Sequence, residues 1–247
     1  MEAADILRGF RGKVATEFKS ARDPVTEADR ASEKFLVEAL EQFYPADGFL
    51  GEEGTERPSR SGYLWVADPL DGTVNFAHGN PHFAVSLGLL KDGVPVAGAV
   101  AHGAADELFT AERGAGSFRN GQRLKTSAIT EPGRALAATD FPYDLAARTG
   151  RCTERMRLLL AHFQSLRVQG SAALELCRVA AGELDVYAGD HTRPWDVAAG
   201  ILILEEAGGV ITAWDGAPLD PMAPTYPLAS NGPLHAAALK ILSALPC

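Results

Sequence analysis

Cysteine is scarce in this sequence, with three among 247 residues, and long apolar runs are absent. Cys152, Cys177 and Cys247 stand at no metal-binding spacing and cannot all pair, so we expect reduced thiols and a cytoplasmic protein. No run approaches the roughly eighteen apolar residues that a membrane-spanning helix needs. The N-terminal segment also lacks the apolar centre of a signal peptide. We therefore expect no association with a membrane.

Basic residues are outnumbered, because 23 lysines and arginines face 32 aspartates and glutamates, which gives a net charge of −9. A chain of this charge repels phosphate backbones, so nucleic acid is not an expected partner. A small anionic substrate remains compatible with this charge, because a bound cation can invert the local field. With 46% hydrophobic and 22% charged residues, the composition is that of a folded globular protein.

Two helices are predicted at the start of the chain, over residues 2–18 and 27–43, from apolar side chains at helical intervals. We expect Thr26 to cap the second helix, with Asp29 completing a capping box. The apolar positions are Ile6, Leu7, Phe10, Val14 and Phe18 in the first helix, and Ala31, Phe35, Leu36, Ala39, Leu40 and Phe43 in the second.

From about residue 48 to 127 short β-like runs alternate with turns. Asp92-Gly93 and Asn120-Gly121 are strong hairpin signals, and five or six antiparallel strands are predicted. Further on, strands and helices alternate. We expect a division into residues 1–132, an N-terminal α+β half with a large antiparallel sheet, and residues 133–247, a C-terminal α/β half, sharing one active-site cleft. The predicted strands are 63–67, 83–90, 94–101, 107–110, 135–139, 166–168, one at Tyr187, and 209–213; the later helices are 151–163, 171–181, 196–207 and 233–244.

The segment ADPLDGTVNF, residues 67–76, places two carboxylates at the end of an apolar run. Because proline has no backbone donor, Pro69 is expected to end the strand at Asp68. Gly72 then permits a turn that points Asp68 and Asp71 into one space, with the Leu70 carbonyl between them. Two such carboxylates favour a hard divalent cation, Mg²⁺ first. Free N–H groups from Thr73 onward suit an anionic oxygen, although an ordinary acidic turn also explains the segment.

Two further acidic stretches have a similar character. GEEG, residues 51–54, places carboxylates between glycines after an apolar run, and WDVAAG, residues 195–200, places Asp196 at the start of an apolar helix. Taken singly, the first is also explained as a solvated turn and the second as a helix cap.

Together the three stretches resemble the signature motifs of the inositol monophosphatase family of Mg²⁺-dependent phosphomonoesterases. The segments DPVTEAD (23–29), ERGAGSFRNGQRL (112–124) and GSAALEL (170–176) add to the resemblance, which runs from about residue 19 to residue 232 in the family's order. The resemblance implies an α+β fold, a layered α/β/α/β/α sandwich related to fructose-1,6-bisphosphatase and other sugar phosphatases.

The resemblance also implies roles for individual residues. Glu52, Asp68 and the Leu70 carbonyl would hold one Mg²⁺, and Asp68, Asp71 and Asp196 a second, with a third, weaker ion near Glu52. Thr73, paired with Asp29, would orient the attacking water; Thr73, Asp29 and Glu52 are thus the candidate catalytic residues. Lys19 is a weaker candidate for the phosphate, because its spacing to Asp23 is one residue short. The candidate substrate contacts are Asp71, Gly72, Thr73, Gly170, Ser171, Ala172 and Asp196.

One stretch departs from the family pattern. Inositol-preferring members carry a glutamate about seven residues before the aspartate of the Trp-Asp motif, and here Ala188 or Gly189 stands at that place. Asp190 is a candidate replacement from a different backbone position. Arg193 and His191 could face a second negative group of a substrate, or Arg193 could pack its stem against Trp195.

The leading hypothesis is a Mg²⁺-dependent phosphatase acting on inositol monophosphate or a similar small polyol or sugar phosphate. The alternatives are the same chemistry on fructose 1,6-bisphosphate, histidinol phosphate or a phosphorylated nucleotide, and a non-catalytic metal-binding interaction protein. An intact pair of Thr73 and Asp29 argues against the last, since a structural metal site needs no water-orienting pair. The resemblance further implies inhibition by Li⁺ and a homodimer.

Overall fold

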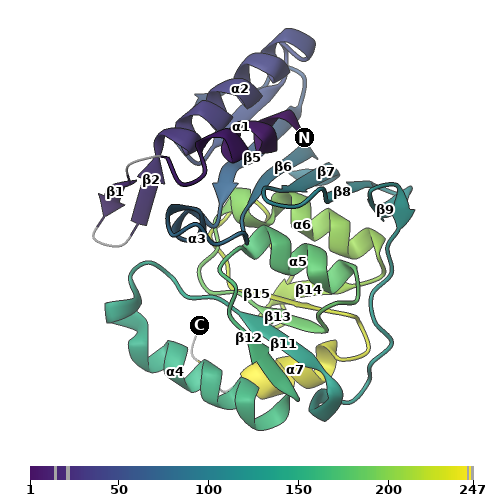
Figure 1. Cartoon of the computed structure of the whole chain (residues 1–247). Coiled ribbons are helices and arrows are strands. Elements are labelled where there is room, and N and C mark those ends of the chain that lie inside the picture. The colour runs from purple at the N-terminus through teal and green to yellow at the C-terminus, as the bar shows by residue number, and fades with distance from the viewer. Residues whose placement is uncertain (14–15, 21–22, 244, 246–247) are drawn as a thin grey trace.

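Five layers make up the protein, in a computed structural model that describes residues 1–13, 16–20, 23–243 and 245 (Figure 1). The helices α1 and α2 lie on one face of an eight-stranded sheet, and α5 and α6 lie on its other face. A five-stranded sheet follows, and α4 and α7 cover its far side. The predicted α/β/α/β/α sandwich is therefore confirmed.

The first helix is shorter than predicted. This helix, α1, spans Glu2–Phe10, and the chain turns away just after it, where Gly12 adopts a left-handed φ of 73°. Residues expected in the helix instead form β1 (Thr16–Ser20), which pairs antiparallel with β2 (Asp23–Thr26). Phe18 is 63% exposed there, so its helical spacing from Phe10 was coincidental. Val14 lies outside the described residues.

The second helix, α2 (Glu27–Phe43), begins as predicted. The Thr26 backbone N–H donates to the Asp29 carboxylate, and the Thr26 hydroxyl accepts from the Ala28 N–H, so the predicted cap is confirmed. The buried face differs from the predicted one, because it carries three polar side chains and Phe43 is exposed. Its members are Ala28, Asp29, Ser32, Glu33, Leu36 and Leu40.

The larger sheet has the strand order β10-β9-β8-β7-β6-β5-β3-β4, with eight strands where five or six were predicted. Only the pairing of β3 with β5 is parallel among these described strands. Both predicted Asp-Gly and Asn-Gly hairpins are confirmed by positive φ at each central residue. The strands are β3 (Gly48–Gly51), β4 (Glu56–Arg57), β5 (Tyr63–Asp71), β6 (Ala84–Lys91), β7 (Val94–His102), β8 (Leu108–Glu112), β9 (Gly116–Arg119) and β10 (Gln122–Arg123).

The smaller sheet has the order β12-β11-β13-β15-β14, and β15 was not predicted. This short strand begins with a proline, a residue that the sequence pattern of a strand disfavours. It nevertheless lies inside the sheet, between β13 and β14. The strands are β11 (Leu136–Thr139), β12 (Ser165–Arg167), β13 (Val186–Ala188), β14 (Val210–Ala213) and β15 (Pro227–Ser230). The helices of this part are α4 (Leu145–His162), α5 (Ala172–Ala180), α6 (Pro194–Glu206) and α7 (His235–Leu242), preceded by a 3₁₀ turn at Pro132–Arg134.

Close contact between α6 and the larger sheet depends on two glycines. A Cβ added to Gly88 would lie 2.8 Å from the Ala198 Cβ, and one added to Gly98 would lie 2.9 Å from the Ala199 carbonyl oxygen. The helix can therefore approach the backbone of β6 and β7. This packing brings the first turn of α6, with Asp196, toward the end of β5.

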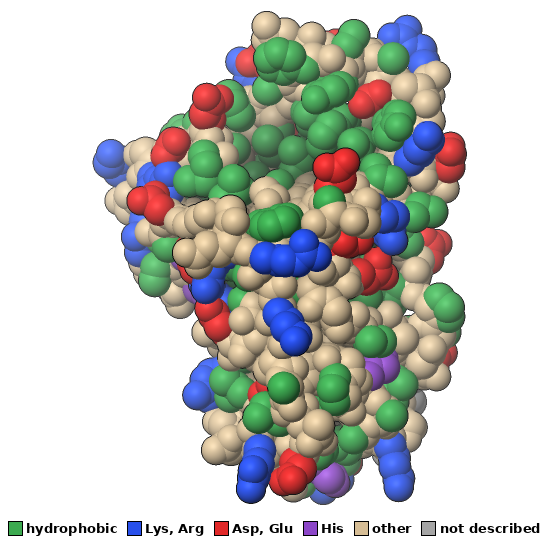
Figure 2. Space-filling view, turned by 90° about the vertical axis from the view of Figure 1, so that its right-hand side faces the viewer, with side chains coloured by type: hydrophobic (Ala, Val, Ile, Leu, Met, Phe, Trp, Pro, Cys, Tyr) green, Lys and Arg blue, Asp and Glu red, His purple; other side chains and the backbone are tan. Residues whose placement is uncertain are grey.

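Part of the larger sheet beyond α1 and α2 forms an apolar groove. Figure 2 shows hydrophobic side chains gathered in a hollow in the upper half of the face turned to the viewer. The groove is lined by Tyr63, Leu89, Val96, Ala97, Gly98, Thr110, Ala111, Glu112, Ala115, Gly116 and Phe118. No helix in the described part of the chain is long and apolar enough to cross a membrane.

Candidate active site

The strand β5 continues through Pro69 to Asp71, so the prediction that it ends at Asp68 was wrong. Asp68 pairs with Ser86 and Asp71 with Ala84, so β5 holds one extra residue between these pairs. A proline is tolerated in such a bulge, because the ladder is already interrupted there. The Ser32 hydroxyl donates to the Pro69 carbonyl at 2.8 Å and fixes the bulge against α2.

Four carboxyl groups from three parts of the chain influence one another at this strand end. Glu52 follows β3, Asp68 and Asp71 belong to β5, and Asp196 lies in the first turn of α6. Burial, followed by the charges of the other three, raises the pKa of Asp68 well above its ordinary value. Burial is also the main reason that the pKa of Glu52 rises to about 7, that of Asp71 to about 6, and that of Asp196 well above its ordinary value. Concentrating buried acids in this way is costly without a compensating cation.

Three of these carboxyls accept hydrogen bonds from nearby protein groups. Asp68 accepts from the Leu70 N–H at 2.9 Å, Asp196 accepts from the Arg193 N–H at 2.7 Å, and Asp71 accepts from the Ala173 N–H and the Ser171 hydroxyl. Among the described residues, no three His, Cys, Asp or Glu side chains stand close enough together to hold a metal ion as they are placed. The donor set consists of carboxylate and carbonyl oxygens, which is the chemistry that Mg²⁺ prefers.

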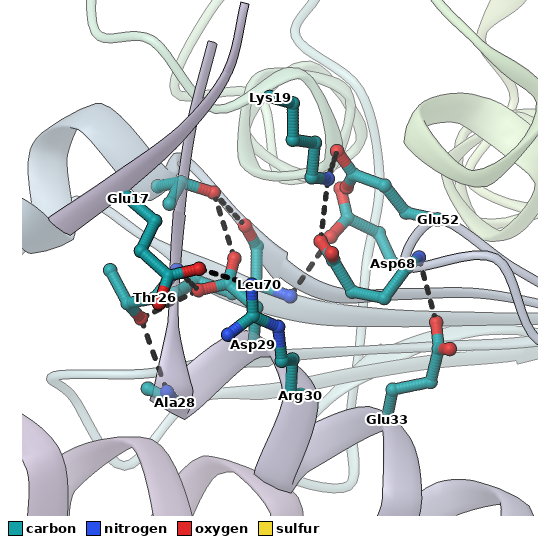
Figure 3. A network of polar contacts seen from close by, with 12 residues as sticks. Glu17, Lys19, Thr26, Ala28, Asp29, Arg30, Glu33, Glu52, Asp68 and Leu70 are labelled. Carbon is teal, nitrogen blue, oxygen red and sulfur yellow. Dashed lines mark hydrogen bonds and ion pairs between the residues drawn. The ribbon is translucent and has the colours of Figure 1, made fainter.

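Lys19 of β1 contacts one of these acids, Glu52, and its neighbour Glu53. Its Nζ lies 3.2 Å from Glu52 Oε1 and 2.6 Å from Glu53 Oε1, and Figure 3 shows the three polar groups of Lys19, Glu52 and Asp68 turned toward one another. Burial opposes the charged form of Lys19, but the two glutamates outweigh it and raise its pKa. Lys19, the weaker candidate for contact with the phosphate, thus forms ion pairs with the carboxylates of Glu52 and Glu53.

The hydroxyl of Thr73 lies beside Asp29 and the Leu70 carbonyl. The Thr73 Oγ1 is 3.1 Å from Asp29 Oδ1 and 3.0 Å from the Leu70 oxygen, and it can donate its proton to one of them. Asp29 is buried, which raises its pKa, while hydrogen bonds from the Thr26 hydroxyl and backbone oppose that rise. A hydroxyl that donates into the protein in this way presents its lone pairs to a further donor.

The segment 170–172 docks against α3 (Thr73–Ala77). Asn75 Nδ2 donates to the Gln169 oxygen at 2.6 Å and to the Gly170 oxygen at 3.2 Å, and the Ser171 hydroxyl caps α5 through the Leu174 N–H. Gly72 has a φ of 89°, and a Cβ on it would lie 3.1 Å from the Gly170 oxygen, so this approach suits glycine alone. Ser171 therefore contacts Asp71, and Gly170 lies beside Gly72.

The segment before α6 offers no carboxylate to a substrate from Asp190. Asp190 and Arg155 form an ion pair at 2.5 Å with both side chains fully buried, so Asp190 does not take the place of the missing glutamate. A side chain at Gly189 is also excluded, since its Cβ would lie 2.7 Å from Pro227 and 2.8 Å from the Tyr187 hydroxyl oxygen. Arg193 is exposed.

Three residues that support the site were missed at the level of sequence: Ser32, Glu33 and Asn75. The first two had a detectable signal, because Asp29, Ser32 and Glu33 are spaced like Leu36 and Leu40 on one helix face. Polar residues on a face that also carries leucines must be buried with partners, which points to a structural task. Asn75 had no comparable signal, since its acceptors are backbone oxygens, and those of Gln169 and Gly170 lie 94 and 95 residues away.

Known proteins resemble this chain over nearly its whole length. The family model described as the inositol monophosphatase family matches residues 2–246. Inositol monophosphatase 2 of Solanum lycopersicum is 41% identical, covering 89% of this chain and 86% of that protein, and an inositol-1-monophosphatase of Rhizobium meliloti is also 41% identical, covering 80% and 75%. The crystal structure of the extragenic suppressor protein suhB from Bartonella henselae superposes with a TM-score of 0.93 at 36% identity, covering 98% of this chain and 94% of that one.

Proposed function

The chain belongs to the inositol monophosphatase family, and we propose that it hydrolyses inositol monophosphate or a similar small polyol or sugar phosphate with a water directed by Thr73. The family consists of metal-dependent phosphatases, and this chain is a phosphatase. The observation that carries the proposed mechanism is the contact of Thr73 with Asp29 beside the four carboxyl groups.

We assign Mg²⁺ to the carboxylates, because buried acids with raised pKa values and neighbouring carbonyl oxygen form a donor set for a hard cation. Glu52, Asp68 and the Leu70 carbonyl would hold one ion, Asp68, Asp71 and Asp196 a second, and Glu52 would support a third. When bound, Mg²⁺ neutralises charge on the phosphate and lowers the pKa of a water molecule.

The protein's own groups then set the direction of attack. Thr73 accepts a hydrogen bond from the water and donates to Asp29, which Thr26 holds in place. The amides of Gly72 and Thr73 contact phosphate oxygens, and Gly170, Ser171 and Ala172 line the space for the departing alcohol. Phosphate-monoester hydrolysis has a loose transition state, so positioning and charge neutralisation account for most of the catalysis.

A phosphate-release assay over a panel of substrates tests this proposal. With Mg²⁺ present, inositol 1-phosphate should be hydrolysed, alongside parallel measurements on fructose 1,6-bisphosphate, histidinol phosphate and a nucleotide phosphate. No turnover of any of them would refute hydrolysis at this site. Turnover of the others without inositol 1-phosphate would refute the substrate assignment alone.

We also propose a cytoplasmic homodimer that Li⁺ inhibits. Cys152 and Cys177 are free and buried, as suits a reducing compartment. The apolar residues of the hairpin region, including those that line the sheet groove, are the proposed contact between the two copies. Light scattering in solution should give twice the chain mass, and a monomer at micromolar concentration would contradict the dimer.

A further inference from the structure

Glu33 of α2 is a buried carboxylate bound to the loop that carries Glu52. The residue is 3% exposed. Oε2 accepts from the Glu53 N–H at 2.9 Å, and Oε1 accepts from the Thr55 N–H at 3.2 Å and the Thr55 hydroxyl at 2.5 Å. Figure 3 shows Glu33 reaching up from α2 to the backbone beside Glu52. One side chain therefore satisfies three donors within three residues of this loop.

The loop is closely fitted to this carboxylate. A Cβ on Gly51 would lie 2.2 Å from Glu33 Oε2, so the residue before Glu52 can only be glycine while Glu33 stays in place. The loop is closed by the Gly51 N–H donating to the Thr55 oxygen at 2.9 Å, and the Glu52 N–H donates to the Ala67 oxygen of β5 at 3.2 Å. The backbone around Glu52 is thus held by hydrogen bonds to the Glu33 side chain of α2 and to the Ala67 oxygen of β5.

The three hydrogen bonds that Glu33 accepts go to a carboxylate, which is a strong acceptor. Hydrogen bonds to an ionised carboxylate are about twice as strong as neutral ones, and inside the protein they hold geometry well. The side chain direction of Glu52 follows from the backbone of residues 51–53, because a side chain leaves its Cα in a direction that the backbone sets. Groups that orient metal ligands in this way typically change metal affinity by about 10–100-fold when they are altered.

We propose that Glu33 is a positioning residue for metal binding, which acts by holding the Glu53 and Thr55 backbone so that Glu52 faces Asp68. The inference rests on the proposed function for the role of Glu52. It needs no contact between Glu33 and the ion.

Replacement of Glu33 by glutamine tests the proposal, since Glu33→Gln keeps the shape of the side chain but loses the charge and one acceptor. Isothermal titration with Mg²⁺ should show about tenfold weaker binding. The half-saturating Mg²⁺ concentration for phosphate release should rise by a similar factor, and raising Mg²⁺ should recover most of the lost turnover. Glu38→Gln, on the exposed part of the same helix, is the matched control and should change neither quantity.

Thr55→Val provides a second, milder variant, because it removes one of the three hydrogen bonds and leaves Glu33 intact. A smaller weakening of Mg²⁺ binding is expected. If Glu33→Gln does not fold, this variant carries the test, and Mg²⁺ affinity within twofold of the wild type would overturn the inference.

A purely structural role for Glu33 predicts a different result. Glu33→Gln would then lower the melting temperature and leave the Mg²⁺ affinity of the folded protein unchanged, and this outcome would also overturn the inference. Failure of the proposed function is distinguishable, since the wild-type protein itself would then release no phosphate from any substrate in the presence of Mg²⁺.

Discussion

The Oγ1 of Thr73 lies 3.1 Å from Oδ1 of Asp29, a residue 44 positions earlier in the chain. The contact joins the first turn of α2 to the first residue of α3, and the same aspartate completes the cap of α2 through Thr26. One carboxylate thus begins a helix and orients a hydroxyl beside four other acids.

Removal of the Thr73 hydroxyl should abolish most of the activity without unfolding the protein. Thr73→Val keeps the side-chain volume but can neither accept from water nor donate to Asp29. We expect kcat to fall by about 10²–10⁴, the usual contribution of a positioned proton-handling group. Thr73→Ser keeps the hydroxyl and should retain far more activity, and equal losses in both variants would contradict the assigned role.

Neutralising Asp71 should remove activity and leave the fold largely intact. Asp71→Asn keeps an acceptor for the Ala173 N–H, so α5 stays docked, but it removes a negative charge from the proposed metal site. Circular dichroism should show an unchanged spectrum while phosphate release falls to background. A fully active Asp71→Asn protein would disprove the assignment of the metal ligands.

Withdrawal of Mg²⁺ should lower thermal stability, because the buried acids then repel one another without compensation. At a Mg²⁺ concentration about 100 times the dissociation constant, binding adds about 2.7 kcal/mol to the free energy of unfolding. For a chain of this size that corresponds to a rise in melting temperature of about 5–10 °C. Differential scanning fluorimetry with EDTA and with added Mg²⁺ measures it, and the Asp71→Asn variant should lose most of the difference.

Breaking the buried pair of Arg155 and Asp190 should destabilise the protein strongly. Arg155→Met removes the close partner of the buried Asp190 charge and leaves it only Arg148, whose Nη1 lies 3.9 Å away, so we expect a cost of about 3–5 kcal/mol in the free energy of unfolding. The double variant Arg155→Met with Asp190→Asn should recover part of that loss, because the buried charge is gone. Urea denaturation measures both. A change in KM for substrate without any loss of stability in Asp190→Asn would show instead that Asp190 contacts the substrate.

Acidification should destabilise the protein partly through His82. Burial, with the neighbouring charges of His102 and Arg178, lowers the pKa of His82 from 6.5 to about 4. Between these values the unfolded chain binds a proton that the folded protein does not, so stability is present above pH 6.5 and is lost as the pH falls toward 4.

His82→Gln removes this contribution. Urea denaturation at pH 7.5 and pH 5 should therefore show a smaller drop in stability for the variant than for the wild type. The residual drop would include His102, whose pKa is also lowered by burial. An identical drop in both proteins would contradict the assignment to His82.

Local chemistry was readable from the sequence wherever neighbouring residues were sufficient. The cap at Thr26 and the hairpins at Asp92-Gly93 and Asn120-Gly121 depend on side chains and backbone angles within four residues, and the structure confirms them. The end of α1 was misjudged for the opposite reason. Phe18 matches a helical period, but the exposed hairpin of β1 and β2 is decided by pairing between strands.

Partners distant in sequence explain the remaining differences. Pro69 was expected to end a strand, and whether a bulge at that point is tolerated depends on β6 and on Ser32 of α2. Asp190 was a candidate substrate contact, but in the structure its carboxylate pairs with Arg155, 35 residues earlier in the chain. Glu33 showed only as a polar residue on an apolar helix face.

From the order of its residues alone, this chain could be recognised as a layered α/β phosphatase with an acidic, oxygen-rich centre, because motif spacing and local propensities survive without knowledge of distant contacts. Which carboxyls face one another, which are taken up by arginine, and which loop is held by Glu33 became known only from the packed structure. The physical reason is that desolvation and charge pairing depend on distances in space, and residues far apart in the chain acquire those distances only when the layers pack.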